Sequence, residues 1–268
     1  MTRRLSVAHL SAVDLPPAQF VEAAARAGFD AVGLRLLRVT PETPGHPLMD
    51  DPAALRETLA ALRDTGLAVN DIEFLRITPE TDIASLGALL DCGAELGASH
   101  LITAPYDDDL GRLAETLGRV DEAAAERGMS AVLEFFPWAV VPDLAACWRM
   151  VQQAGPRVGI LADSLHADRS GSSLDLLGQI PANRLPFAHL CDAPVHPPYT
   201  TDELFHTARV ERLVPGTGEI DLAAFVAALP PETALGVEVP MTARTAEIGA
   251  PAVLAELGAA TRAFLDAL

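Results

Sequence analysis

Positive charge is scarce in this chain of 268 residues. There are 19 Lys and Arg residues against 37 Asp and Glu residues, which gives a formal net charge of −18. A surface of this sign repels phosphate backbones, so the composition argues against a nucleic-acid partner. Cysteine is also rare, and Cys92, Cys147 and Cys191 have no metal-ligand spacing. A reducing environment suits this odd number better than secretion, and we expect a cytoplasmic protein.

Long apolar runs are absent as well. No stretch approaches the roughly 18 uncharged apolar residues that a membrane-spanning helix needs. The apolar stretch at residues 5–10 is too short for the core of a signal peptide, and Pro16 and Pro17 follow soon after. We therefore expect no membrane partner. Half of the residues are hydrophobic and 21% are charged, which excludes an intrinsically disordered chain.

Three common sequence motifs are missing. There is no Gly-x-Ser-x-Gly elbow, which argues against a serine hydrolase, and no Walker loop for nucleotide phosphates. No Gly-x-Gly-x-x-Gly turn follows the first apolar run, as a doubly wound dinucleotide-binding sheet would require. Gly216-Thr217-Gly218 comes late in the chain and lacks the third glycine.

One local pattern recurs along the chain: an amphipathic stretch rich in Ala and Leu, then a glycine, then a short apolar run. A glycine just past a helix accepts the left-handed conformation that closes it, so the pattern predicts helix ends at Gly28, Gly66, Gly97 and Gly128. Helix starts are expected where Asp51 precedes Pro52 and, similarly, where Asp14 precedes a pair of prolines.

Eight short apolar runs begin near residues 5, 31, 67, 100, 131, 158, 186 and 234. The first six intervals are about 26 to 36 residues long, which is the size of a β-α-β unit. Continuous rather than alternating apolar runs are typical of parallel strands buried on both faces. We therefore predict a (β/α)8 TIM barrel formed by residues 1–268 as a single domain, with an open doubly wound sheet as the rival fold.

Polar residues end four consecutive strands of this predicted barrel. They are Glu134, Asp163, His189 and Glu238. Each has an ordinary structural explanation by itself: an ion pair with an arginine, a helix cap or a hydrogen-bonded core histidine. Together, three carboxylates at adjacent strand ends would repel one another, and unpaired buried charge costs several kcal/mol.

A divalent cation resolves this repulsion. Three carboxylates and one imidazole suit a hard or borderline ion, and we expect one ion, Mn²⁺ in the first place, with Mg²⁺, Co²⁺ or Zn²⁺ as alternatives.

Further polar residues lie near these strand ends. His166 follows Asp163 by three residues and is expected either to bind substrate, to orient a ligand or to be a solvated loop histidine. Asp192 is expected to be a turn residue or to support the site. Arg35 and Glu73 are expected either to contact an acidic substrate or, slightly favoured, to pair with each other.

These residues carry a resemblance to a known family. Glu134 after a strand, the pairs Asp163-x-x-His166 and His189-Leu-x-Asp192, Arg212 before Pro215-Gly216-x-Gly218-x-Ile220-Asp221, and the closing Glu238 resemble the xylose isomerase-like sugar isomerase and epimerase superfamily. The similarity covers nearly the whole chain.

The resemblance implies a metal held by Glu134, Asp163, His189 and Glu238. It also implies that Glu134 and Glu238 act as acid and base, and that His166 and Arg212 contact substrate oxygens. Cys191, Thr217 and Arg35 depart from the common pattern, in which a lysine, an acidic residue and a glutamate are frequent.

The expected activity is a metal-dependent isomerase or epimerase of a small ketose or other polyhydroxy carbonyl compound, working by proton transfer through an enediolate. The alternative is a metal-dependent dehydratase of a cyclic keto-polyol or a dehydroshikimate-like substrate. A catalytically silent barrel that binds a sugar or a protein is a third hypothesis, which the complete four-residue set disfavours. Assembly into a homo-oligomer is compatible with the sequence.

Overall fold

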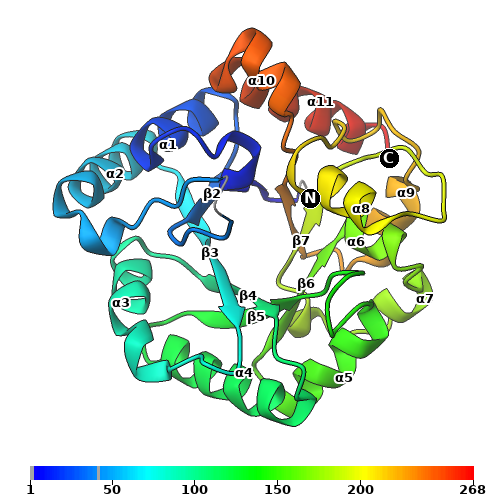
Figure 1. Cartoon of the computed structure of the whole chain (residues 1–268). Coiled ribbons are helices and arrows are strands. Elements are labelled where there is room, and N and C mark those ends of the chain that lie inside the picture. The colour runs from blue at the N-terminus through cyan, green and yellow to red at the C-terminus, as the bar shows by residue number, and fades with distance from the viewer. Residues whose placement is uncertain (1–2, 41–42) are drawn as a thin grey trace.

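The computed structural model of the chain describes residues 3–40 and 43–268. Eight parallel strands pair in the order of the sequence, and β8 pairs with β1 to close a barrel. Figure 1 shows these strands at the centre with the helices around them. The strands are β1 (Leu5–Val7), β2 (Ala31–Arg35), β3 (Ala68–Ile77), β4 (His100–Pro105), β5 (Ser130–Glu134), β6 (Gly159–Asp163), β7 (Phe187–Leu190) and β8 (Ala234–Val237). The eight predicted strands and the TIM-barrel fold are confirmed.

Helices connect the strands on the outside of the barrel, and several of them follow each of the last three strands. The α-helices are α1 (Pro17–Arg26), α2 (Pro52–Thr65), α3 (Gly87–Glu95), α4 (Leu110–Ala125), α5 (Leu144–Ala154), α6 (Ser164–Arg169), α7 (Leu174–Leu177), α8 (Thr201–Arg209), α9 (Leu222–Ala228), α10 (Thr242–Ile248) and α11 (Ala250–Asp266). Short 3-10 turns are η1 (His9–Ala12), η2 (Leu48–Asp50), η3 (Ile83–Leu86) and η4 (Ala182–Arg184).

The predicted helix ends and starts are confirmed, and one predicted cap is wrong. Positive φ angles, from 73° to 81°, occur at each of the four glycines at 28, 66, 97 and 128. The Asp51 side chain accepts hydrogen bonds from the backbone N–H groups of Ala53 and Ala54, as a helix cap does. Asp14 does not cap α1, because Pro16 occupies the N-cap position and has no side-chain oxygen.

The period of two along a strand decides which side chains enter the barrel. In β5, Ala131 and Leu133 pack outward against the helices, while Val132 belongs to the small cluster inside the barrel. Glu134, two residues after Val132, therefore also points inward. The same alternation applies in β6 and β7, where Leu161 and Phe187 lie inside two residues before the acidic or histidine side chain.

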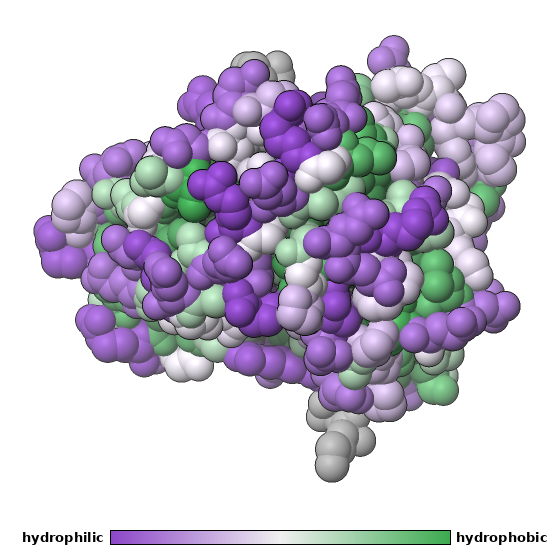
Figure 2. Space-filling view, turned by 90° about the horizontal axis from the view of Figure 1, so that it is seen from below, coloured by the Kyte–Doolittle hydropathy of each residue, from purple (hydrophilic) through white to green (hydrophobic). Residues whose placement is uncertain are grey.

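The outer surface is mostly hydrophilic. In the side view of Figure 2, purple residues dominate and the green ones form small separate patches. Within residues 3–40 and 43–268, the exposed large hydrophobic side chains are Leu110 and Leu268. In the same ranges, no single helix is long and apolar enough to cross a membrane. Helices α10 and α11 taken together meet these two criteria, but they are bent by 116° relative to each other.

Candidate active site

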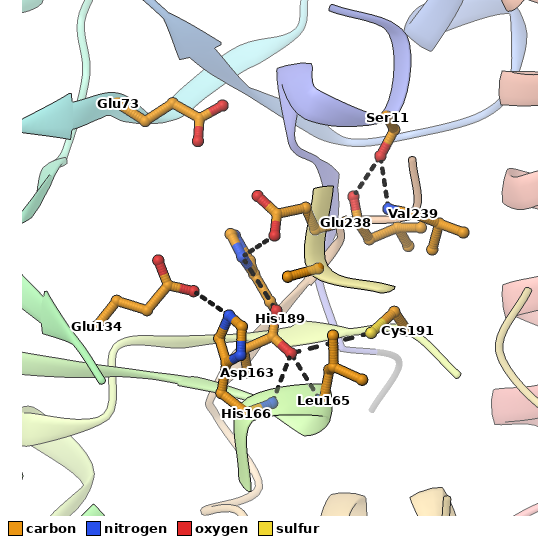
Figure 3. Close-up of polar contacts among 12 residues, drawn as sticks. Ser11, Glu73, Glu134, Asp163, Leu165, His166, His189, Cys191, Glu238 and Val239 are labelled. Atoms are coloured by element: carbon orange, nitrogen blue, oxygen red, sulfur yellow. Dashed lines mark hydrogen bonds and ion pairs between the residues drawn. The ribbon is translucent and has the colours of Figure 1, made fainter. Parts of the chain in front are cut away.

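Four strand ends bring their polar side chains to a common point inside the barrel. Glu134, Asp163, His189 and Glu238 each offer a ligand atom, and these atoms all lie within 4.8 Å of one another. All four residues are at most 5% exposed. Figure 3 shows their side chains converging at the carboxyl ends of the strands. The structure thus brings together the whole set that the sequence singled out.

The contacts within this cluster fit a cation better than a closed hydrogen-bond network. His189 Nδ1 lies 3.7 Å from Glu238 Oε2 and 4.0 Å from Asp163 Oδ2, which is too far for hydrogen bonds. Glu134 Oε1 and His189 Nδ1 are buried and have no hydrogen-bond partner among the described residues. Buried polar atoms rarely stay unsatisfied, and three carboxylates with one imidazole are ordinary ligands of a divalent ion. The group is therefore able to bind one divalent metal.

The cluster takes up protons when no cation compensates its charge. Burial, together with repulsion from Glu238, raises the pKa of Glu134 well above its usual value. Burial by itself would lower the pKa of His189, but the charges of Glu238 and Glu134 outweigh it and raise that pKa to about 10. Both shifts favour the protonated side chain, which reduces the negative charge of the cluster.

Asp163 uses its two oxygens for different partners. Oδ1 accepts hydrogen bonds from the backbone N–H of Leu165 at 2.7 Å and of His166 at 3.4 Å, and so caps α6. Oδ2 accepts a hydrogen bond from Arg212 Nη1 at 2.7 Å. Asp163 is therefore both the helix cap and a member of the candidate metal site, which the sequence presented as competing interpretations. Arg212 helps to lower its pKa although burial opposes this.

Arg212 joins two of the candidate ligands. Its guanidinium is 2% exposed and donates from Nη1 to Asp163, while Nη2 lies 2.8 Å from Glu238 Oε2. Nη1 also donates to the Glu238 carbonyl oxygen at 3.0 Å and approaches the Cys191 sulfur at 3.4 Å. The predicted contact of Arg212 with substrate remains a prediction, because its described partners are groups of the protein itself.

A cavity of about 580 Å³, including the space open to solvent at its mouth, lies above the cluster. Its walls combine aromatic side chains with the charged groups of the strand ends. The lining residues are Leu10, Arg35, Val39, Thr40, Thr43, Glu73, Phe74, Tyr106, Glu134, Phe136, Trp138, His166, Ala208, Arg209, Arg212 and Glu238.

Tyr106 and Arg209 were not singled out by the sequence. Tyr106 directly follows β4, so inspecting that strand end would have found it; Arg209 ends α8 and has no such signal.

The remaining predicted site residues also line this cavity. His166 Nε2 lies 3.7 Å from Glu134 Oε1, and burial lowers the pKa of His166 to about 4, so the ring is neutral at pH 7. Arg35 Nη2 donates to Glu73 Oε2 at 3.0 Å, which confirms the favoured interpretation that these two residues pair. Their contact with substrate stays a prediction.

Asp192 organises the long segment after β7. Its carboxylate accepts hydrogen bonds from the backbone N–H groups of Gly216, Gly218 and Ile220. A Cβ atom on Gly218 would clash with Asp192 Oδ1, so this close approach requires glycine. The two motifs at 189–192 and 215–221 are thus parts of one structure, and Asp192 acts as the turn residue that the sequence favoured.

Two curated proteins resemble the chain in sequence. An inosose isomerase from Bacillus velezensis is 26% identical over 228 residues, which cover 79% of this chain and 78% of that protein. A 3-dehydroshikimate dehydratase from Pseudomonas putida is 27% identical over 241 residues. That match covers 85% of this chain and 35% of the dehydratase, so the chain spans about a third of the longer protein.

Solved structures resemble it in fold. The IolI protein with a bound zinc atom superposes with a TM-score of 0.79 at 17% identity, covering 96% of each chain. A D-psicose 3-epimerase determined in the presence of D-fructose gives a TM-score of 0.73 at 16% identity, covering 97% of each chain. Residues 21–257 match the Xylose isomerase-like TIM barrel family, and the chain belongs to this family.

Proposed function

We propose that this protein is a metal-dependent isomerase or epimerase of a small ketose or other polyhydroxy carbonyl compound. The observation that carries the proposal is the buried set of three carboxylates and one imidazole at the base of a cavity. The similarity to an inosose isomerase and to the fold of a D-psicose 3-epimerase supports the substrate class.

One divalent cation would be held by Glu134, Asp163, His189 and Glu238. When bound, it supplies Lewis-acid polarisation of the substrate carbonyl and compensates the negative charge that develops on the substrate during the reaction. The zinc in the similar IolI structure supports zinc as the first ion to test. The manganese expected from the sequence remains an expectation that metal analysis of the purified protein decides.

Glu134 and Glu238 are the proposed acid and base. They come from β5 and β8, with β6 and β7 between them, so they approach a ligand in the cavity from different strands. One glutamate removes the proton from the carbon beside the carbonyl, and the other returns a proton to the resulting enediolate. Each carboxylate has two oxygens, so one would be able to hold the cation while the other would accept or donate the proton.

His166 and the aromatic wall complete the proposed site. His166 is neutral at pH 7 because burial lowers its pKa to about 4, so one ring nitrogen donates to a substrate oxygen and the other accepts. The rings of Phe136 and Trp138 pack edge to face with the His166 ring, at centroid distances of 4.8 and 5.3 Å. This packing holds the ring in place and excludes water from one side of the site.

Solvent exchange tests the proposed chemistry. Zinc-loaded protein is incubated in D₂O with a panel of ketoses and cyclic keto-polyols, and deuterium at the carbon beside the carbonyl is measured by NMR. We expect exchange with the wild type and with the exposed control Glu232→Gln, and a loss of at least about a hundredfold with Glu134→Gln or Glu238→Gln. Unchanged exchange in both site variants would refute the assigned roles.

Dehydration is the second candidate function. It is favoured by the 27% identity with a 3-dehydroshikimate dehydratase over 85% of this chain. The same two glutamates would serve it: one removes the proton, and the other protonates a hydroxyl group that leaves as water from the β carbon. In the same panel, formation of a conjugated enone, seen as new ultraviolet absorbance, would replace epimer formation.

A further inference from the structure

Arg35 and Glu73 form a buried ion pair in the wall of the cavity, at the ends of two barrel strands. Arg35 ends β2, and the strand register places Glu73 of β3 directly beside it. Asp71 and Gly33, two residues earlier, are register partners in the same way. Figure 3 shows the Glu73 carboxylate pointing into the interior that it shares with Glu134. The pair is therefore set by the sheet and not by a flexible loop.

One hydrogen bond leaves each member of this pair partly unsatisfied. Arg35 Nη2 donates to Glu73 Oε2 at 3.0 Å, and the side chains are 7% and 1% exposed. Arg35 Nε and Glu73 Oε1 are both buried and have no hydrogen-bond partner in the described parts of the chain. The pair thus leaves one donor and one acceptor, on two residues that line the cavity, without a partner in the part of the chain that the structure describes.

These two free atoms suit a hydroxyl group. A hydroxyl both donates and accepts, so it satisfies an arginine N–H and a carboxylate oxygen at the same time. A carboxylate has no proton to donate. It would satisfy Arg35 Nε while bringing a second negative charge against Glu73, and like charges in a buried site repel strongly.

The formal charges around the cavity lead to the same result. Four buried carboxylates, those of residues 73, 134, 163 and 238, contribute −4, and the buried guanidiniums of Arg35 and Arg212 contribute +2. One divalent cation brings this sum to zero. Asp71, buried deeper in β3, adds further negative charge when it is ionised. A substrate carboxylate would therefore add a negative charge that no buried group compensates.

We propose that the Arg35–Glu73 pair makes this cavity selective for an uncharged polyol, by hydrogen bonding its hydroxyl groups and rejecting the carboxylate-bearing counterpart. This inference rests on the proposed function in placing a polyhydroxy compound in the cavity. It narrows the substrate to an uncharged keto-polyol, whichever of the two reactions follows.

Binding of two matched probes tests the proposal. Myo-inositol is a cyclohexane ring with hydroxyl groups alone, and quinate is a hydroxylated cyclohexane ring that carries a carboxylate. Their dissociation constants are measured by calorimetry with zinc-loaded protein. We expect the wild type to bind myo-inositol at least roughly tenfold more tightly than quinate.

Three variants separate charge from hydrogen bonding. In Glu73→Gln the Arg35 charge is uncompensated, so the ratio of the two affinities should move at least about tenfold toward quinate. In Arg35→Gln the remaining Glu73 charge should move the ratio further toward myo-inositol. The double variant Arg35→Gln/Glu73→Gln removes both charges of the pair, so both probes should bind more weakly and the preference for myo-inositol over quinate should shrink. Circular dichroism verifies that each variant is folded.

The opposite pattern overturns the proposal. A wild type that binds quinate as tightly as myo-inositol, or that binds neither, contradicts it, as does a folded double variant that keeps the wild-type ratio. Arg209, the exposed guanidinium stacked on Phe205 at the mouth, is the competing anion site. Loss of quinate binding in Arg209→Gln alone would locate the carboxylate there instead.

The proposed function and this inference fail separately, because the binding measurement requires no turnover. Selective polyol binding without solvent exchange would contradict the proposed reaction and support the proposed selectivity. Solvent exchange without the predicted selectivity would support the reaction and contradict the selectivity.

Discussion

Arg212 Nη1 lies 2.7 Å from Asp163 Oδ2, deep inside the barrel. The same guanidinium reaches Glu238 through its other terminal nitrogen, so two of the four candidate ligands share one fixed positive charge. Because Arg212 holds one oxygen of each carboxylate, it limits how the two side chains can rotate. The second oxygen of each carboxylate stays available for another partner. The guanidinium holds the site in shape when no cation is bound.

Replacing Arg212 should therefore matter most in the metal-free protein. We expect Arg212→Met to lower its free energy of unfolding by on the order of 3 kcal/mol, because two buried carboxylates lose their partner. The loss should be smaller with zinc bound, since the cation compensates the same charges. Urea unfolding in EDTA and in excess zinc measures both values. Arg244→Met, which breaks exposed ion pairs, is the control, with an expected change of at most about 1 kcal/mol. Equal losses in the two metal states would contradict this explanation.

The stability of the metal-free protein should fall as the pH rises above neutrality. The pKa of His189 is raised from its usual 6.5 to about 10, so the folded state binds more protons than the unfolded state within that window. This stabilisation is fully present below pH 6.5 and is lost as the pH rises through 10. The raised pKa of Glu134 acts in the same direction. Urea unfolding of EDTA-treated protein between these pH values measures the slope.

Zinc should remove most of this dependence, because a neutral His189 then binds the metal and its proton has left. The apparent zinc affinity should rise with pH over the same window. His189→Gln provides the control, in which the metal-free slope becomes flatter. A slope that is the same for the wild type and for this variant would rule out His189 as the titrating group.

Local patterns were sufficient to predict the barrel and the four converging side chains. Glycine at a helix end and a short apolar run are both local features, and the eight strands are found where these runs begin. The inward direction of Glu134 and its counterparts follows from the alternation of side chains along a strand. This alternation is a property of every strand, so it can be predicted from the sequence once the strands are located. The continuous apolar runs locate them, because each strand is buried on both faces.

The connections between charged groups could not be read from the sequence. Arg212 lies 49 residues from Asp163, and the path of the chain between them depends on how the loop after β7 folds. Asp163 uses one oxygen for a helix cap and the other for an ion pair. A prediction that assigns one role to each residue misses this combination. Arg209 reaches the cavity from α8, and α8 belongs to the irregular segment for which no repeat predicts a position.

The three thiols should be unreactive in the folded protein. Cys92, Cys147 and Cys191 are all buried, and burial raises the pKa of Cys92 to about 11 and that of Cys191 to about 12. The thiolate is the reactive form, so native protein at pH 8 should react with Ellman's reagent at far less than one thiol per chain. Three thiols should react at once in denaturant. Rapid modification of the native protein would contradict the burial of at least one of them.

The loop that Asp192 ties together should open when this carboxylate is changed. Asp192→Asn places an amide N–H₂ group among backbone donors at Gly216, Gly218 and Ile220, so acceptors are lost and donors face each other. We expect faster hydrogen exchange across residues 215–221 and a loss of about 2 kcal/mol in the free energy of unfolding. Asp108→Asn, at an exposed position, is the matched control and should change neither measurement. If amide protection in that loop were the same in both variants, the carboxylate would not be what organises it.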